Sequence, residues 1–279
     1  MLVPTLLLLA AFLVIPAIYV GWLSFNSSTY GQATNFVGLT NYAQLFSDPI
    51  FWRAFWNTFL IVNGIVYAEL FLGLGLAVLL SPPLPGKALI IAVILAPYAI
   101  TESSGIVMWR YMFEPDVGMV SHLLSSLGLG QLDWSTNPVE TLLLASTIAI
   151  WHHLPFTFLI LYSALTTVPR EVLEASEIDG ATRWQQFTLI VLRLILPAVL
   201  LAVLFRYIFA IRTFAEIWLL TEGGPARLSE VLAIYLYREM FKYHQFGMAA
   251  ATGCFMLVMS IVIALPYLQR MYREVRRNA

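Results

Sequence analysis

Six long apolar runs constrain the fold of this chain more than any other feature. Hydrocarbon offers no water to backbone N–H and C=O groups, so a crossing segment must be a helix of about 20 residues or a strand of a closed barrel. Because these runs are long and unbroken, we predict an all-α polytopic membrane protein with about six transmembrane helices. The predicted helices are Leu2–Leu23, Phe55–Leu80, Ala88–Met108, Thr141–Leu165, Ile195–Leu220 and Ala249–Leu268.

The composition agrees with this fold class. Hydrophobic residues make up 60% of the 279 residues and charged residues only 11%, which is too apolar for a soluble domain. We therefore expect one transmembrane domain over residues 1–279, in contact with the lipid bilayer. The net charge of -1 argues against a nucleic-acid partner. Cys254 is the only cysteine, so we expect no intramolecular disulfide and no metal site.

An even number of spans places both ends of the chain on one side of the membrane. Lys and Arg are enriched in cytoplasmic loops, so their distribution indicates which side this is. With the ends inside, eight basic residues are cytoplasmic, and five lie on the outer side of the membrane or near it. The inner group is Lys87, Arg170, Arg183, Arg193, Arg270, Arg273, Arg276 and Arg277, and the outer group is Arg53, Arg110, Arg227, Arg238 and Lys242. We therefore predict that both ends are cytoplasmic.

The three outer segments, Asn26–Ala54, Phe113–Glu140 and Thr221–Met248, are rich in turn-forming residues and can form an external platform. The segment Thr166–Leu194 is then the longest cytoplasmic stretch. Pro169 suits the first position of a helix, and Gly180 suits the left-handed position that ends one.

A second helix can begin with Thr182 as its cap, since Trp184, Phe187 and Val191 follow at helical spacing. The pattern therefore predicts helix, glycine break, helix. Two interpretations of this cytoplasmic element are open. Amphipathic loop helices often lie at the membrane interface, and they can also dock on a partner protein.

The charge of the segment separates these interpretations. Its carboxylates would be repelled by an anionic inner leaflet, which attracts basic segments. The acidic residues are Glu171, Glu174, Glu177 and Asp179. A protein surface that carries Arg or Lys is therefore the better expectation.

The run Glu174–Ala181, followed by Trp184, Phe187 and Pro197, resembles the EAA loop of binding-protein-dependent ABC importer permeases. Its Asp-Gly-Ala ending resembles the carbohydrate-uptake branch, of the maltose, trehalose and glycerol-phosphate type. The chain departs from that pattern at Arg193, where the family usually has proline. Further resemblance lies at Phe36–Tyr42, Pro97–Trp109 and Leu220–Pro225, so that it covers nearly the whole chain.

The resemblance implies a type I ABC importer permease fold in a bacterial or archaeal cytoplasmic membrane. In such permeases this loop is a coupling helix that sits in a groove of the ATPase subunit. Carried over by position, Glu174 and Asp179 contact that subunit or orient the loop, Gly180 permits the turn, and Ala175 and Ala181 allow close approach. The implied partners are a second permease subunit forming a heterodimer, two ATP-binding subunits, an extracytoplasmic solute-binding protein and a sugar or polyol.

ATP hydrolysis is not expected in this chain. A P-loop needs a glycine six residues before its Lys and a Ser or Thr after it. Around Lys87, those two positions hold Ser81 and Ala88. We also find no nucleophile–base arrangement, so we expect no cofactor here and place ATP and Mg²⁺ on the partner ATPase.

Several ionisable residues lie inside the predicted spans, where a charge costs about 2.5–3.5 kcal/mol. They are Glu69, Glu102, His152, His153, Arg206, Arg212 and Glu216. Glu69 and Arg206 can either tie helices together or face the cargo path. Arg212 and Glu216 are four residues apart, which would let them pair on one helix face. Adjacent histidines point about 100° apart, so only one can face inward.

Aromatic faces bind sugars, which makes Tyr98, Trp109, Trp151, Tyr207 and Trp218 candidate liners, although Trp and Tyr also favour membrane interfaces. Our pathway candidates are Tyr98, Glu102, Trp151, His152, Arg206 and Tyr207. A secondary transporter of a small polar solute is the main alternative, and it predicts a midplane ion site, discontinuous helices and internal repeats. A membrane enzyme or scaffold is a second, and it predicts a reactive constellation or a large soluble domain.

Overall fold

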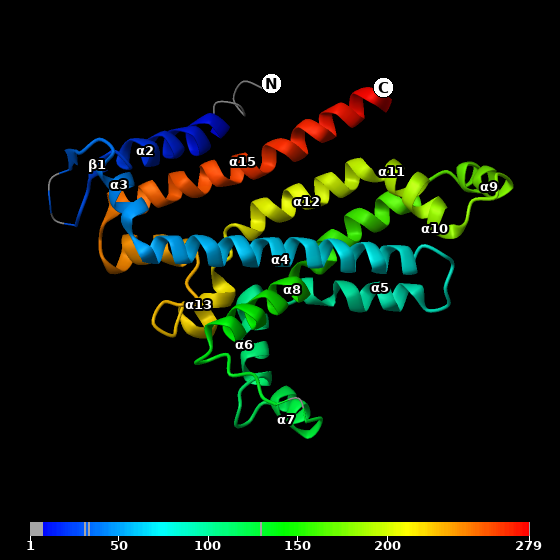
Figure 1. Ribbon diagram of the computed structural model, residues 1–279, viewed down its shortest axis with the longest axis horizontal. Coiled ribbons are helices and arrows are strands. Elements are labelled where there is room, and N and C mark those ends of the chain that lie inside the picture. The colour runs from blue at the N-terminus through cyan, green and yellow to red at the C-terminus, as the bar shows by residue number, and fades with distance from the viewer. Residues whose placement is uncertain (1–7, 31, 33, 129, 279) are drawn as a thin grey trace.

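The computed structural model describes residues 8–278 except 31, 33 and 129, and its described elements are almost entirely helical. The long helices pack against one another and run along the longest axis of the molecule (Figure 1). They are α4 (Pro49–Leu79), α8 (Pro138–Thr166), α12 (Leu196–Ala210) and α15 (Phe246–Asn278), and the short α13 (Ala215–Thr221) follows α12. The all-α polytopic fold predicted from the apolar runs is confirmed.

The helices α4 and α8, which pack against each other most extensively, begin with the same kind of N-terminal cap. Asp48 accepts a hydrogen bond from the N–H of Ile50 at 2.8 Å, and Asn137 accepts one from Val139 at 3.0 Å. Each cap is followed by proline at the start of the helix, where its missing N–H costs nothing. Farther along α4, a Cβ on Gly73 would lie 3.1 Å from Thr157, so this glycine allows the two backbones to approach.

Four of the described helical stretches are long and apolar enough to cross a membrane. They are Pro49–Leu79, Pro138–Thr166, Leu196–Thr221 and Phe246–Arg273, and they correspond to the second, fourth, fifth and sixth predicted spans. The fifth is interrupted between α12 and α13, a break that the predicted span Ile195–Leu220 did not include.

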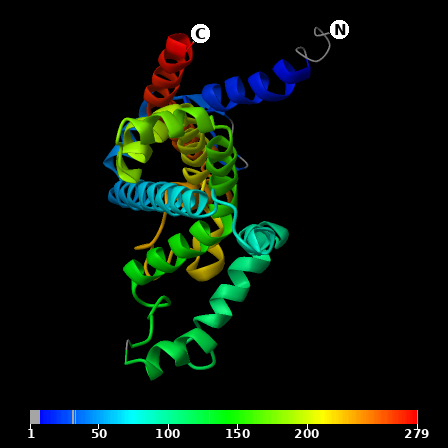
Figure 2. The same cartoon turned by 90° about the vertical axis from the view of Figure 1, so that its right-hand side faces the viewer.

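The third predicted span, Ala88–Met108, is wrong as a continuous helix. The chain instead forms α5 (Lys87–Leu95), the 3₁₀ turn η2 (Ala96–Ala99) and α6 (Glu102–Met112), and the two halves are bent by 100°. Thr101 has extended backbone and its hydroxyl donates to Ser104 at 2.8 Å, as at the start of a new helix. The helix α6 therefore leaves the bundle, together with α7 (Met119–Ser126) beyond it (Figure 2).

The first predicted span is described only in part, because residues 2–7 lie outside the described residues. The rest forms a short π-helical turn and a helix, which together make an apolar stretch, Ala10–Leu23, that is shorter than the four long ones. It packs mainly on α15, and many of its large apolar side chains are exposed. The two elements are η1 (Ala10–Val14) and α2 (Ile15–Leu23).

The turn-rich segments gather at one end of the bundle. The N–H of Phe246 donates to the carbonyl of Ser28 at 2.8 Å, and Thr29 forms a β-bridge with Gln245, so the first and third segments lie side by side. Figure 1 places β1 (Asn26–Ser27) and α3 (Thr40–Ser47) at the end opposite α9 (Arg170–Ile178). The short elements of these segments are β1 (Asn26–Ser27), β2 (Asn35–Phe36), α3 (Thr40–Ser47), α14 (Leu232–Tyr237) and η4 (Arg238–Lys242).

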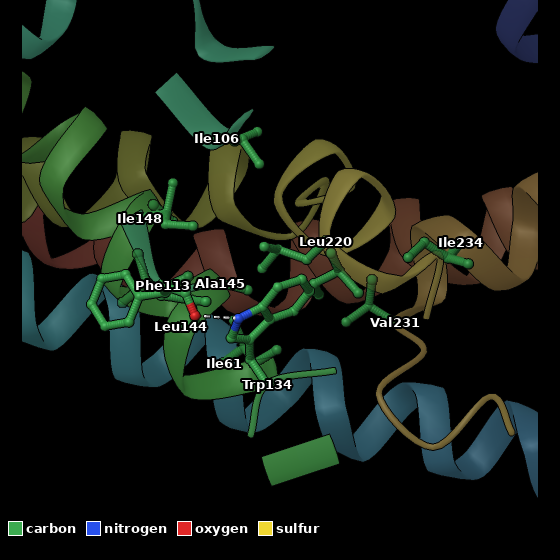
Figure 3. Packing of buried hydrophobic residues seen from close by; sticks show 13 residues of the cluster. Ile61, Ile106, Phe113, Trp134, Leu144, Ala145, Ile148, Leu220, Val231 and Ile234 are labelled. Atoms are coloured by element: carbon green, nitrogen blue, oxygen red, sulfur yellow. Dashed lines mark hydrogen bonds between the residues drawn. The ribbon is translucent and has the colours of Figure 1, made fainter. Parts of the chain in front are cut away.

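A buried cluster around Trp134 joins the second turn-rich segment to the third (Figure 3). The indole N–H of Trp134 donates to the carbonyl of Phe113 at 2.8 Å, and the ring packs with Leu220 and Val231. Only 3% of Trp134 is exposed, so burial of this ring contributes about 2–3 kcal/mol to the free energy of folding. The cluster fixes the segments that follow α6 and α13 against each other.

Candidate functional site

The first candidate site is the segment between α8 and α12. Its first helix, α9 (Arg170–Ile178), ends in a Schellman motif, in which the N–H of Ala181 donates to Ser176 at 2.9 Å and the N–H of Gly180 to Glu177 at 3.0 Å. Gly180 has a φ of +79°, which other residues adopt only with strain. The glycine break predicted from the sequence is confirmed.

The segment then restarts as a helix, as predicted. The hydroxyl oxygen of Thr182 accepts from the N–H of Gln185 at 3.3 Å, and the Gln185 side chain accepts from the N–H of Thr182 at 2.8 Å, which completes a capping box. The predicted position of Pro169 is one residue off, because α9 begins at Arg170. The elements that follow are α10 (Arg183–Gln185), η3 (Gln186–Val191) and α11 (Leu192–Leu194).

The junction with the fifth span lies at Ile195, where the chain turns between α11 and α12. Pro197 stands in the first turn of α12, where a proline needs no N–H partner. The chain therefore bends here without a proline at position 193.

The acidic side chains of this segment are exposed and form no ion pair within the described part of the chain. They are Glu171, Glu174, Glu177 and Asp179. Apolar residues beside them are exposed as well: Ile178 by 86% and Trp184 by 73%. Ala175 is exposed and Ala181 is half-buried. Both side chains are small, so neither would keep a neighbouring chain away. Charged and apolar groups thus stand together on an unpartnered surface.

The second candidate site is a cavity of about 440 Å³ between the broken third span, α8 and the junction of α12 with α13. Its wall combines ionisable groups with aromatic rings. The lining residues are Tyr98, Glu102, Ala149, His153, Phe156, Arg206, Phe209, Ala210, Arg212, Thr213, Phe214, Ala215 and Glu216. A cavity of this size, with a few polar groups among apolar ones, is typical of a small-molecule site.

Two breaks in the predicted spans create this cavity. The bend before α6 presents Tyr98 and Glu102, and the interruption before α13 presents Arg212 and Glu216. The predicted pairing of Arg212 with Glu216 is wrong, because the chain leaves the helix at Ile211 and no ion pair joins these two side chains. The Arg212 guanidinium instead lies over the ring of Phe209, 5.8 Å from its centre.

Glu69 and Arg206 form a buried ion pair between α4 and α12. Nη2 of Arg206 donates to Oε1 of Glu69 at 2.7 Å, and Nε donates to Oε2. The hydroxyl of Thr157, on α8, donates to the same carboxylate at 3.4 Å. The exposed fractions are 0% for Glu69 and 3% for Arg206. Three helices are therefore tied together beside the cavity.

The pathway candidates from the sequence are found in three places. Tyr98, Glu102 and Arg206 line the cavity. His152 lies behind it, with its ring 5.9 Å from that of Tyr98, and His153 faces the cavity instead. The Nδ1 atom of His152 is buried and has no hydrogen-bond partner in the described part of the chain.

Trp151 and Tyr207 lie away from the cavity. The Trp151 ring packs against Trp109 at 5.6 Å, and Tyr207 donates to Asn63 at 2.7 Å within the cluster that α12 forms with α4 and α15. The aromatic liners that the sequence did not single out are Phe156, Phe209 and Phe214. Their only sequence signal is helical spacing from Arg206 and His153, which many buried phenylalanines share.

This fold matches solved transporter structures. A bacterial alginate ABC transporter, in complex with an alginate pentasaccharide-bound periplasmic protein, contains a chain with a TM-score of 0.84 and 23% identity. The match covers 96% of this chain and 91% of that one. Since the identity is low, the likeness concerns the fold.

The sequence matches curated relatives over nearly its whole length. A probable ABC transporter permease protein of Pyrococcus horikoshii is 32% identical, with 99% of this chain and 96% of the relative covered. The sulfoquinovosyl glycerol transport system permease protein of Agrobacterium fabrum is 32% identical (96% and 88% covered). The trehalose/maltose transport system permease protein of Thermococcus litoralis is 30% identical (98% and 94% covered).

A family model described as binding-protein-dependent transport system inner membrane component matches residues 1–268. The matched region contains the acidic segment with its glycine break and every residue of the cavity wall. The chain belongs to this family, and it is a permease component of an ABC transport system.

Proposed function

We propose that this chain forms one half of the membrane channel of an ATP-driven importer for a sugar or polyol. The whole chain, 1–279, acts as one transmembrane domain, and residues 166–194 are its coupling loop. The observation that carries the proposal is the exposed α9 segment, in which four unpaired carboxylates and two exposed apolar residues surround a Schellman turn at Gly180.

The coupling role follows from what this surface lacks. Exposed Ile178 and Trp184 lose contact with water when a partner covers them, and the neighbouring carboxylates favour a basic protein surface over an anionic membrane. Glu174 and Asp179 bind or orient that partner, Gly180 permits the turn, and Ala175 and Ala181 let the partner approach closely. We assign this partner as an ATP-binding subunit, present in two copies in the complex, which holds ATP and Mg²⁺.

The second half of the channel is a similar permease subunit, so the cavity described above is completed by a partner chain. A solute-binding protein on the outer side delivers the cargo to the platform formed by the turn-rich segments. The named cargoes of relatives, sulfoquinovosyl glycerol and trehalose or maltose, support a sugar or polyol. The aromatic and polar wall of the cavity suits such a cargo, since ring faces cover sugar faces and polar groups bind hydroxyls.

The proposed membrane is the cytoplasmic membrane of a bacterium or archaeon, with both ends inside. In Figure 1, α9, the connection from α4 to α5 and the C-terminal end of α15 lie at the same end of the bundle. Lys87 and the basic residues of α15 then share the cytoplasmic side with the coupling loop, in agreement with the distribution of positive charge.

Purification in a mild detergent tests this function. We expect the chain to co-purify with an ATPase and a second permease, and ATP hydrolysis in proteoliposomes to rise when the binding protein and its sugar are added. A strain that lacks the chain should lose uptake of one sugar in a labelled panel. A chain that purifies alone and accumulates a solute on an ion gradient would instead be a secondary transporter.

A further inference from the structure

The Glu69–Arg206 pair has one member on the cavity wall and one behind it. Arg206 lines the cavity, and Glu69 does not. Glu69 binds the guanidinium through two nitrogens, Nε and Nη2, so the arginine is held along one edge. Thr157 donates to the carboxylate from α8, which fixes Glu69 from a third helix. The orientation of Arg206 is thus set by residues that cannot themselves touch the cargo.

The remaining nitrogen of Arg206 is free for a ligand. A guanidinium has five N–H donors, and Glu69 takes the one on Nε and one on Nη2, which leaves the second on Nη2 and the two on Nη1. Nη1 has no hydrogen-bond partner in the described part of the chain, and Arg206 is part of the cavity wall. An oxygen of a cargo in the cavity can accept a hydrogen bond from it.

The pairing also removes the net charge of this donor. An anionic cargo would gain little from Arg206, because Glu69 already neutralises it, whereas a hydroxyl needs only a well-placed donor. Elsewhere on the wall there is one further arginine, Arg212, and there are two carboxylates, Glu102 and Glu216. The cavity therefore carries no surplus of positive charge.

We propose that Glu69 is a specificity-determining positioning residue, which orients Arg206 as a charge-compensated donor and makes the cavity select neutral polyhydroxyl compounds over anionic sugars. This inference rests on the proposed function, since it concerns the cargo of the same channel. It separates two chemical classes that occur among relatives: trehalose and maltose are neutral, and sulfoquinovosyl glycerol carries a sulfonate.

The test is direct cargo binding to the assembled complex in detergent, without the solute-binding protein, whose own selectivity would mask that of the channel. Labelled trehalose and labelled sulfoquinovosyl glycerol are the probes. The unaltered complex should prefer trehalose. Glu69→Gln keeps the shape of the side chain and exposes the charge of Arg206, so the ratio of the two affinities should shift toward the anionic sugar by about tenfold or more.

Two further variants separate specificity from structure. Glu114→Gln removes the same charge at a residue that lines no part of the cavity, and it should leave the ratio unchanged. The double variant Glu69→Gln with Arg206→Gln keeps the site uncharged but removes the donor. It should lose about tenfold in trehalose affinity and gain nothing for the anionic sugar.

An unchanged affinity ratio in Glu69→Gln would overturn the inference and leave the proposed function standing. If that variant does not assemble, the double variant decides: trehalose affinity equal to that of the unaltered complex would overturn the inference as well. A complex whose unaltered form imports and binds no sugar or polyol would instead contradict the proposed function, and the inference would fall with it.

Discussion

Two acidic groups at opposite ends of the bundle have opposite environments. On α9, Glu171, Glu174, Glu177 and Asp179 are exposed and unpaired within the described residues. In the segment between α13 and α15, Glu230 is completely buried and Glu239 is 7% exposed. The same residue types therefore serve two different purposes.

The carboxylate of Glu230 is satisfied from within the chain. Nε and Nη2 of Arg227 donate to the two oxygens of Glu230 at 2.6 Å each, and Nε of Arg238 lies 3.4 Å from the same carboxylate. The hydrogen bonds to Glu230 raise the pKa of Arg227 above its usual value. Nδ2 of Asn57, on α4, holds the same loop by donating to the carbonyls of Leu228 and Glu230, each at 2.8 Å.

The environment of a carboxylate in this protein, buried and paired or exposed and unpaired, indicates its role. A carboxylate that is buried and bonded twice fixes a loop, and its removal leaves partners uncompensated. An exposed, unpaired carboxylate contributes little to stability, so its use must lie in contact with something else. Loss of stability is thus the expected phenotype at one end, and loss of coupling at the other.

The largest expected effect is at the coupling end. Gly180→Pro should abolish the stimulation of ATP hydrolysis by cargo, because proline fixes φ near −65° and the Schellman turn requires +79°. The protein should still insert, since Gly180 is exposed and no neighbour lies within 4 Å of a Cβ there. Gly180→Asn is the matched control, because asparagine tolerates the left-handed conformation.

Glu174→Lys tests the charge at the same end. It should also remove the stimulated hydrolysis, by repelling a basic partner, without a change in the unfolding temperature. Stimulation that survives both Gly180→Pro and Glu174→Lys would show that α9 does not transmit the signal.

The next effect is at the buried end and has the opposite character. Glu230→Gln should lower the free energy of unfolding by about 3 kcal/mol, since Arg227 and Arg238 would keep their charges without a carboxylate between them. This loss is measured by thermal unfolding in detergent, monitored with a fluorescent dye that does not react with thiols. Glu177→Gln, on the exposed face of α9, should change the unfolding temperature little, and an equal fall in both variants would remove the contrast.

The exposed end was largely predictable from sequence, because its signals are local. Gly180 as the helix stop and Thr182 as the next cap need only a few neighbouring residues. The second, fourth and sixth spans were predictable for the same reason. The bend after Pro97 was not anticipated, although Thr101-Glu102 is a typical helix start, because the apolar run continues on both sides.

The cavity was predictable only in its charged residues. A charged residue at membrane depth usually faces a cavity or pairs with another group, and this singles out Glu102 and Arg206. The rule does not say which residues each side chain contacts. The choice between His152 and His153 depends on how α8 is rotated against α12, and this is decided by tertiary packing. Tyr207 was chosen as an aromatic on the correct span, yet it faces α4 and α15.

A pH titration sharpens the comparison at the buried end. Burial raises the pKa of Glu239 to about 7, with smaller contributions from the charges of Asp48 and Glu230, while Arg227 acts in the opposite direction. The folded protein thus favours the protonated form. Its stabilising effect is complete below about pH 4.5, the value for an unburied glutamate, and is lost as the pH rises through 7.

The measurement is the unfolding temperature of the purified protein at pH 5 and pH 8. It should be higher at pH 5, and Glu239→Gln should reduce the difference because glutamine does not titrate. Glu171→Gln, on the exposed α9, should leave the difference as it is. A pH dependence that is unaltered in Glu239→Gln would place the titrating group elsewhere.

The smallest expected effect returns to the coupling loop, at its second helix. Thr182→Ala removes the hydroxyl that caps α10 and should cost about 1 kcal/mol locally. Amide exchange at Gln185 should quicken about fivefold, since that N–H is the one bonded to Thr182. Stimulated ATP hydrolysis should fall only in part, because the turn at Gly180 stays intact. Full loss of coupling in Thr182→Ala would mean that the cap, rather than the glycine turn, holds the acidic surface in its working orientation.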